Sequence, residues 1–143
     1  MSRTLLLISL FAMIAMLAAA SAAPPQGDSE HRVFELRTYV ANEGKLDALN
    51  KRFRDHTNAL FKKHGITMIG YWVPQDEKDG HNNTLVYLLA FPSREAARKA
   101  WAAFGADPEW TRAKADSEKD GVLVNRENVR SVFLDPTDYS PMK

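Results

Sequence analysis

The chain has 143 residues, of which 45% are hydrophobic and 26% charged, and it carries a formal net charge of +1 with no cysteine. This length and composition are typical of one globular domain, and they exclude a collagen-like, coiled-coil or wholly disordered protein. A sequence without cysteine excludes disulfides, thiolate metal sites and iron–sulfur clusters. A charge near zero gives no basis for nucleic-acid binding, which requires a strongly basic surface.

Residues 1–22 have the pattern of a secretory signal peptide. One cation, Arg3, precedes an apolar run over residues 5–17, and the small residues ending at Ala22 match a signal peptidase site. An uncleaved membrane anchor is the alternative, but it needs about 20 apolar residues and this run is shorter. We therefore expect an exported protein, periplasmic or secreted, which is free of the membrane after cleavage.

Residues 23–30 read APPQGDSE, which predicts a flexible linker before a folded domain over residues 31–143. Arg3 is the only charged residue in the predicted signal peptide, so the mature chain of 121 residues is electrically neutral.

The first half of the domain predicts a strand, a helix and a second strand. Residues 32–40 alternate, so that Phe34, Leu36 and Thr38 share one face and Glu35, Arg37 and Tyr39 the other. A helix is expected from a cap at Asn42 to a stop at Gly65. Its apolar stripe comprises Leu46, Leu49, Phe53, His56 and Leu60. Residues 66–73 predict the second strand.

The second half repeats this order after a polar loop over residues 75–83. A strand is expected over residues 84–91, followed by a helix that opens at Pro92-Ser93 and ends at Gly105. Asp107-Pro108 predicts the start of another short helix, because it combines an N-cap residue with proline at the first helical position. Residues 128–134 predict the last strand, before a tail over residues 135–143.

Two βαβ units in tandem predict an α+β fold of the ferredoxin-like βαββαβ type, with one antiparallel four-stranded sheet and helices on one face. The other face would be bare, which favours a homodimer through the sheets. We place Glu35, Arg37 and Tyr39 on this bare face.

The order of several segments resembles the NIPSNAP family of the dimeric α/β-barrel superfamily. These segments are FELRTYV (34–40), FKKHGITMIGYW (61–72), NTLVYLLAF (83–91), WAAFGADPEW (101–110) and SVFLDPTDYSP (131–141). The resemblance implies a ferredoxin-like domain that pairs into a dimeric α/β barrel. It implies little chemistry, because family members share no established reaction. The secretory signal departs from the animal members, which are chiefly mitochondrial, so no role in mitophagy is transferred.

Four residues are candidates for catalysis. Glu35, Arg37 and Tyr39 would combine an acid, a fixed cation and a phenol, which can hold and polarise a small oxygenated ligand. The alternative is that Glu35 and Arg37 pair with each other or across a dimer interface, and we favour the interface role. His56 is a candidate general base or ligand; we favour the alternative of a hydrogen-bonded core histidine between helix and sheet.

The candidates for ligand binding are aromatic: Tyr71, Trp72, Tyr87 and Trp101. Tyr71 and Trp72 are adjacent on a strand, so one of them faces each side of the sheet. We expect Trp101 to form a packing cluster with Phe104 and Trp110, with a pocket rim as the alternative.

No metal site or cofactor is expected. His56 and His64 lie two helical turns apart, unlike the one-turn spacing of a zinc-binding pair, and no phosphate or dinucleotide motif occurs. A haem held by a histidine is conceivable, but no spacing requires it.

The predicted function is binding of a small hydrophobic or aromatic molecule in an inter-sheet cavity. The alternatives are a cofactor-poor monooxygenase or isomerase and a structural dimeric scaffold.

Overall fold

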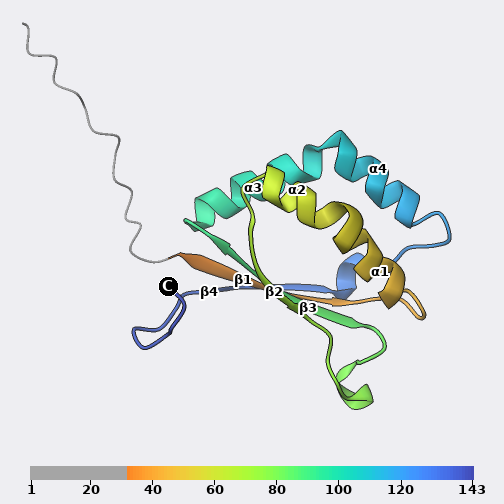
Figure 1. Ribbon diagram of the computed structural model, residues 1–143, viewed down its shortest axis with the longest axis horizontal. Coiled ribbons are helices and arrows are strands. Elements are labelled where there is room, and N and C mark those ends of the chain that lie inside the picture. The colour runs from red at the N-terminus through yellow and green to blue at the C-terminus, as the bar shows by residue number, and fades with distance from the viewer. Residues whose placement is uncertain (1–31) are drawn as a thin grey trace, which may run out of the picture.

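The computed structural model describes residues 32–143, so the predicted signal peptide and linker lie outside the described residues. Helices and strands follow each other in the order seen in Figure 1. The elements are β1 (Val33–Val40), α1 (Leu46–Arg52), η1 (Phe53–Thr57), α2 (Asn58–Lys63), β2 (Thr67–Trp72), η2 (Glu77–Asp79), β3 (Thr84–Phe91), α3 (Arg94–Ala106), α4 (Pro108–Ser117), η3 (Arg126–Asn128) and β4 (Val129–Leu134).

The four strands form one antiparallel sheet in the order β2-β3-β1-β4. The helices α1 to α4 all lie over one face of this sheet (Figure 1). The predicted ferredoxin-like βαββαβ fold is therefore confirmed. No helix within residues 32–143 is long and apolar enough to cross a membrane.

Both helix starts predicted for the second half are confirmed. The hydroxyl of Ser93 accepts a hydrogen bond from the Ala96 N–H and caps α3, which relieves one of the unpaired N–H groups of the first turn. Asp107 does the same for α4 by accepting from the Glu109 N–H at 2.9 Å.

The first helical segment differs from its prediction in two ways. The helix begins at Leu46, and the side-chain oxygen of Asn42, which would cap a helix, accepts instead from the Asn125 amide at 3.1 Å. The helix also contains a π turn, η1, in which the N–H of Asn58 bonds to the carbonyl of Phe53, five residues earlier. Thr57 strengthens this turn, since its hydroxyl donates to the carbonyl of Arg52 at 3.3 Å.

A core rich in aromatic side chains fills the space between the helices and the sheet. Its largest fully buried side chains include Tyr87, Phe61, Phe91 and Leu49. Phe104 contacts Trp101 and Trp110, with ring centroids 5.6 Å and 4.6 Å apart, so the packing cluster expected between α3 and α4 is confirmed.

The predicted orientation of β1 is wrong. Glu35 is only 1% exposed, and its side chain reaches Trp101 of α3, so Glu35, Arg37 and Tyr39 lie on the helix-covered face. Unpaired charges are costly to bury, which favours the bare face for such residues. Here Glu35 is buried and Arg37 and Tyr39 are partly buried, because each has a polar partner between the two layers.

The opposite, open face of the sheet is largely apolar. Trp72 is 52% exposed and Leu134 is 41% exposed. Gly70 is required beneath the Trp72 ring, because a Cβ atom there would lie 2.7 Å from it. The remaining side chains of this face, placed by the strand registers, include Leu36, Thr38, Val86, Leu88 and Val132, with the exposed Arg130 opposite Thr38.

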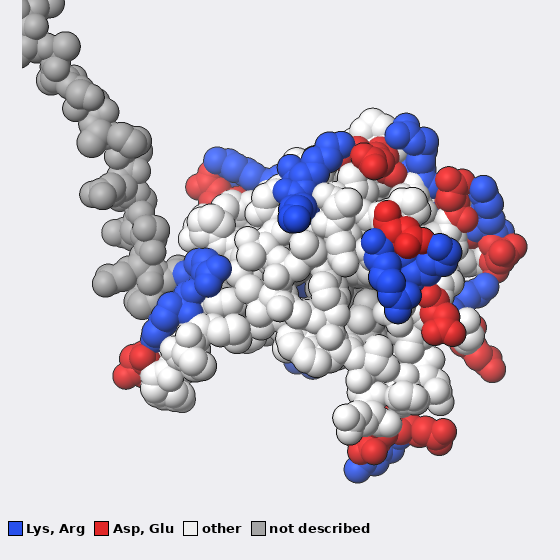
Figure 2. Space-filling model, viewed as in Figure 1, with Lys and Arg blue, Asp and Glu red and all other residues white. Residues whose placement is uncertain are grey.

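Two projections flank this open face. The segment around η2 and the C-terminal tail both extend away from the helices (Figure 1). Figure 2 shows the domain from the side, with the sheet nearly edge-on, and the part of this side between the two projections is mostly free of charged side chains. The tail is tied back to the sheet, since the Arg32 side chain donates to the Lys143 carbonyl at 2.8 Å.

Candidate functional site

A buried carboxylate, Glu35, lies between the sheet and α3. One of its oxygens accepts from Arg37 at 2.6 Å and from the Ser131 hydroxyl at 2.5 Å, and the other accepts from the Trp101 indole at 2.6 Å. The three donors come from β1, β4 and α3. Glu35 therefore connects two strands to a helix, and both of its oxygens are occupied.

The guanidinium of Arg37 lies between Glu35 and two aromatic rings. Its central carbon is 4.4 Å from the Trp101 ring centroid, and one nitrogen donates to the Tyr39 hydroxyl at 3.2 Å. Burial by itself would lower the pKa of Arg37. The neighbouring Tyr87, Tyr39 and Glu35 outweigh burial and raise this pKa, so the side chain is a permanent cation.

Tyr87 lies at the centre of the aromatic core, opposite Arg37 in the β1–β3 register. Its ring centroid is 5.3 Å from that of Tyr39, 5.2 Å from that of Phe53 and 5.6 Å from that of Tyr71. Within residues 32–143, no group makes a hydrogen bond of normal geometry to its hydroxyl. Burial, reinforced by Tyr39, raises the pKa of Tyr87 well above its ordinary value, so this phenol is neutral.

A pocket of about 190 Å³ opens beside this core, between the first helical segment and the sheet. We call it the aromatic pocket; it is lined by Asn50, Phe53, Arg54, Asn58, Tyr71 and Leu85. The Tyr71 hydroxyl donates to the side-chain oxygen of Asn58 at 2.8 Å across one wall. Burial raises the pKa of Tyr71 to about 12, so this phenol is a neutral hydrogen-bond donor.

The π turn gives the aromatic pocket its shape. A π turn inserts one extra residue, and such turns are frequent at functional sites. Here it places Phe53 against Tyr71, with centroids 5.7 Å apart at an interplanar angle of 69°. Sequence reasoning missed Asn50, Arg54 and Asn58. Tyr71 could have led to Asn58, because a half-buried phenol needs a polar partner on the facing helix.

The structure brings most of the predicted site residues into one region, on the covered side of the sheet. Glu35, Arg37, Tyr39, Tyr71, Tyr87 and Trp101 are linked to one another by the contacts above. Trp72 lies apart from them on the open face.

His56 is also apart from this cluster, and the prediction of a core histidine is wrong. His56 is exposed, and Thr57 is buried in its place. The extra residue of the π turn rotates the following side chains around the helix axis, which turns His56 to solvent. It lines a separate surface groove of about 380 Å³ between α1 and α4.

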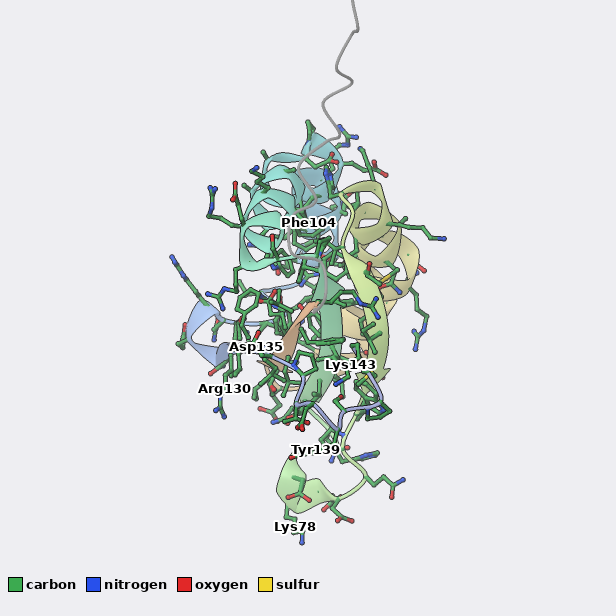
Figure 3. The ribbon with its side chains drawn as sticks, turned by 90° about the vertical axis from the view of Figure 1, so that its left-hand side faces the viewer. Lys78, Phe104, Arg130, Asp135, Tyr139 and Lys143 are labelled. Atoms are coloured by element: carbon green, nitrogen blue, oxygen red, sulfur yellow. The ribbon has the colours of Figure 1, made fainter. Side chains whose placement is uncertain are left out.

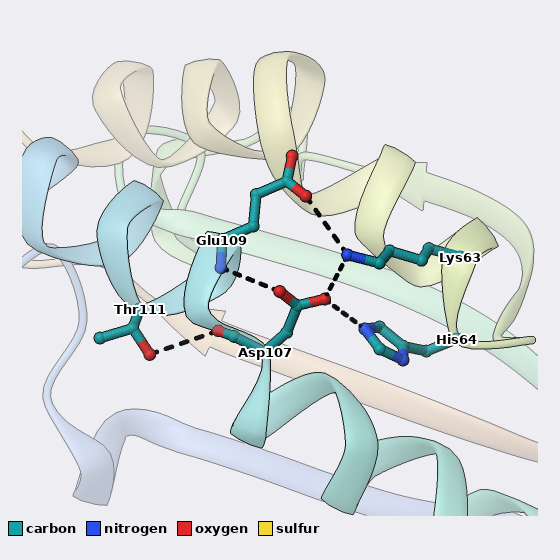
Figure 4. A network of polar contacts seen from close by, with 5 residues as sticks. All are labelled: Lys63, His64, Asp107, Glu109 and Thr111. Carbon is teal, nitrogen blue, oxygen red and sulfur yellow. Dashed lines mark hydrogen bonds and ion pairs between the residues drawn. The ribbon is translucent and has the colours of Figure 1, made fainter.

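A second polar network joins α2 to α4 (Figure 4). The Asp107 carboxylate accepts from Lys63 at 2.8 Å and contacts the His64 ring nitrogen at 2.7 Å. The hydrogen bonds from Lys63 and His64, together with the capped N–H of Glu109, hold the pKa of Asp107 well below its usual range. The contact with Asp107 gives His64 a structural role between the two helices, which its spacing from His56 did not indicate.

The described part of the chain offers no metal site. Among residues 32–143, no three histidine, aspartate or glutamate side chains are grouped so as to hold a metal ion. The chemistry of the covered side is thus that of phenols, amides, the carboxylates of Glu35 and Asp107, and the guanidinium groups of Arg37 and Arg52.

A four-stranded antiparallel sheet with helices on one face defines the chain as a ferredoxin-like α+β domain. The NIPSNAP family model matches residues 34–141, and the chain therefore belongs to the NIPSNAP family. No curated protein matches the chain in sequence.

Solved structures of similar proteins support this assignment. Atu4242 from Agrobacterium tumefaciens, a NIPSNAP family protein with unknown function, is 26% identical over 79% of this chain and 95% of its own, with a TM-score of 0.66. Atu5224 from the same organism, also of the NIPSNAP family, is 22% identical over 79% of this chain and 100% of its own, with a TM-score of 0.67.

A more distant likeness is to SnoaB from Streptomyces nogalater, a cofactor-independent oxygenase. It is 14% identical over 78% of this chain and 98% of its own, with a TM-score of 0.51, and it shares the fold.

Proposed function

We propose that this protein is an exported binding module for a small molecule with a single aromatic ring and a hydroxyl group. The observation that carries the proposal is the aromatic pocket between Phe53 and Tyr71, opened by the π turn and bordered by the Asn58 amide. The pocket lies within one protomer, between helix and sheet, rather than between two sheets as the sequence suggested.

The size of the pocket limits the ligand. Sites for drug-sized molecules occupy roughly 300–1,000 Å³, whereas a cavity of roughly 150 Å³ lined by apolar side chains is sufficient for benzene. At about 190 Å³ the aromatic pocket suits one ring with a small substituent. Phe53 and Tyr71 supply aromatic contact, and Leu85 supplies an aliphatic floor.

The polar groups favour a ligand hydroxyl over a charged group. Asn58 accepts from Tyr71 through its oxygen, which leaves its amide hydrogens as donors. Arg54 lines the same pocket and is exposed, so its charge is solvated. A phenol fits this combination, because its ring takes the apolar walls and its oxygen accepts from the amide.

The occupied state of Glu35 supports binding rather than catalysis. A general base must reach its substrate, whereas Glu35 is only 1% exposed and its carboxylate already accepts from three donors of the protein. Its role is to hold the layers together, and the ligand meets the cluster only at Tyr71 and Phe53.

The test is a titration of the mature protein with p-cresol, followed by calorimetry and by amide NMR. We expect saturable binding, with shifts at the Asn58 side chain, and no binding of 4-methylcyclohexanol. The Asn58→Ala variant should weaken p-cresol binding roughly 2- to 12-fold, the value of one hydrogen bond. Asn50→Trp should fill the pocket and abolish binding, whereas Asn128→Ala, outside it, should have no effect.

Native mass spectrometry of the purified protein complements the titration. A co-purifying molecule with a single aromatic ring supports the binding module. If p-cresol does not bind and no molecule co-purifies, the proposal is wrong and the structural scaffold takes its place.

N-terminal sequencing of the exported protein tests signal-peptide cleavage, for which we expect a mature N-terminus at Ala23. A full-length membrane-bound form would instead support an anchor.

The open face supports a homodimer as the working form. Trp72 and Leu134 are exposed on an apolar sheet face, and such faces are usually buried against a partner. Sedimentation equilibrium of the mature protein should give the mass of a dimer, and Trp72→Glu should convert it to a monomer. A monomeric mass for the unsubstituted protein would exclude pairing through this face.

A cofactor-independent oxygenase, the activity of SnoaB, is the second candidate. The observation that favours it is the buried Tyr87 hydroxyl, which lies against the Arg37 cation without a normal hydrogen bond. Oxygen-electrode assays with p-cresol and catechol would detect uptake dependent on the protein. Uptake that is lost in Tyr87→Phe, at unchanged p-cresol affinity, would favour the oxygenase over the binding module.

A further inference from the structure

A second pocket, of about 400 Å³, lies on the other flank of the domain, between α3 and the edge strand β4. We call it the arginine pocket; it is lined by Arg94, Glu95, Arg98, Trp101 and Phe133. In Figure 3 the strand β4 lies below α3 on one side of the molecule. The aromatic pocket lies beside β2, at the opposite edge of the sheet.

The floor of the arginine pocket is aromatic and firmly positioned. Trp101 donates its indole N–H inward to Glu35 at 2.6 Å, which fixes the ring and leaves no polar atom of the indole for the pocket. Phe133 lies on β4 directly opposite Glu35 in the register, so it faces the same side of the sheet. The Trp101 ring and the part of Phe133 that Arg94 leaves uncovered offer a rigid apolar surface of the kind that aromatic ligands contact.

The rim of the pocket carries positive charge that is not neutralised locally. Within residues 32–143, no carboxylate lies within 4 Å of the Arg94 side-chain nitrogens. Glu95 is the only acid that lines the pocket. It pairs with Lys99 at 2.8 Å, whereas its contact with Arg98 is a long 3.9 Å.

Arg94 is also held in place before any ligand binds. The central carbon of its guanidinium is 3.6 Å from the centroid of the Phe133 ring, which is a stacked cation–π arrangement. A planar guanidinium fixed in this way keeps its N–H edge available and loses less conformational entropy on binding a carboxylate than a free lysine.

From this combination we infer that the arginine pocket binds a small amphipathic carboxylate, with its apolar part on Trp101 beside the Arg94–Phe133 stack and its carboxylate on Arg94 and Arg98. Arginine pairs with carboxylates through two parallel N–H···O bonds, which gives such a ligand both affinity and orientation. The volume, about twice that of the aromatic pocket, admits a bicyclic or short-chain acid. This site is independent of the phenol site in position and in ligand charge.

The test uses 2-naphthoate as the probe and 2-naphthylmethanol as its neutral analogue. Binding to the mature protein is followed by the indole N–H resonances in NMR, assigned with Trp72→Phe and Trp110→Phe. We expect the Trp101 resonance to shift with 2-naphthoate and the neutral analogue to bind at least tenfold more weakly. The double variant Arg94→Gln/Arg98→Gln should reduce 2-naphthoate affinity at least tenfold, because both side chains are exposed and their loss leaves the core intact.

Matched control variants distinguish binding in the arginine pocket from binding in the aromatic pocket. Arg54→Gln removes an exposed arginine from the aromatic pocket, and Asn58→Ala weakens that pocket; both should leave 2-naphthoate affinity unchanged. Affinity that falls in Asn58→Ala but not in Arg94→Gln/Arg98→Gln would place the probe in the aromatic pocket and overturn the inference. Equal binding of the neutral analogue would also overturn it, and neither result bears on p-cresol binding.

Discussion

Replacement of Glu35 by glutamine is expected to destabilise the fold severely, although it changes only one atom. An amide has one acceptor oxygen, so if it accepts from Arg37 and Ser131, its NH2 group faces the Trp101 N–H and that hydrogen bond is lost. A hydrogen bond to a charged group contributes about 1.5–3 kcal/mol. Arg37, whose side chain is 16% exposed, also loses its counter-charge. Breaking a buried pair in this way costs about 3–5 kcal/mol in all.

Thermal unfolding monitored by circular dichroism measures this cost. At roughly 4 °C per kcal/mol for a domain of this size, Glu35→Gln should melt about 12–20 °C below the unsubstituted protein. The double variant Glu35→Gln/Arg37→Met should recover part of the loss, because no charge then lacks a partner. A melting temperature within about 4 °C of the unsubstituted protein would refute the view that Glu35 holds the layers together, as would strictly additive effects in the double variant.

Three further perturbations test other parts of the fold. Lys63 and His64 lower the pKa of Asp107, so its carboxylate stabilises the folded state above the ordinary aspartate pKa of 3.8. This stabilisation is lost as the pH falls below that value. The difference in melting temperature between the unsubstituted protein and Asp107→Asn should therefore be largest near neutral pH and shrink in acid. Ser93→Ala removes the cap of α3 and should cost about 1 kcal/mol in chemical denaturation, whereas the same change at Ser140 in the tail should cost less. Leu123→Ala truncates a side chain that is 1% exposed and should cost about 2–5 kcal/mol by the same measurement.

The order and nature of the elements could be predicted from the sequence because local patterns determine them. The strand over residues 84–91 was predicted with the bounds that the structure has, since a run of β-branched, aromatic and apolar residues is bounded there by polar loop residues and proline. Asp107-Pro108 likewise marked the start of α4, because cap chemistry depends only on neighbouring residues.

The position of the site could not be predicted from those patterns. Alternation along β1 separates two sets of side chains, but it does not say which set meets the helices. The missing information was non-local: an indole N–H in the apolar stripe of α3 needs a buried acceptor, and Glu35 is that acceptor. The π turn was also missed, because a regular spacing of apolar residues fits an unbroken α-helix equally well and leaves His56 on the wrong side.

The strand order has a consequence for when the domain folds. β1, the first described strand, pairs with β4, the last, and Glu35 is bonded to Ser131, 96 residues further along the chain. Closing so long a loop is slow, and contacts of this separation dominate folding rates. A chain that has not yet released residues 129–134 lacks both the second neighbour of β1 and one donor to the buried carboxylate. The sheet is therefore completed only once residues 129–134 have left the ribosome.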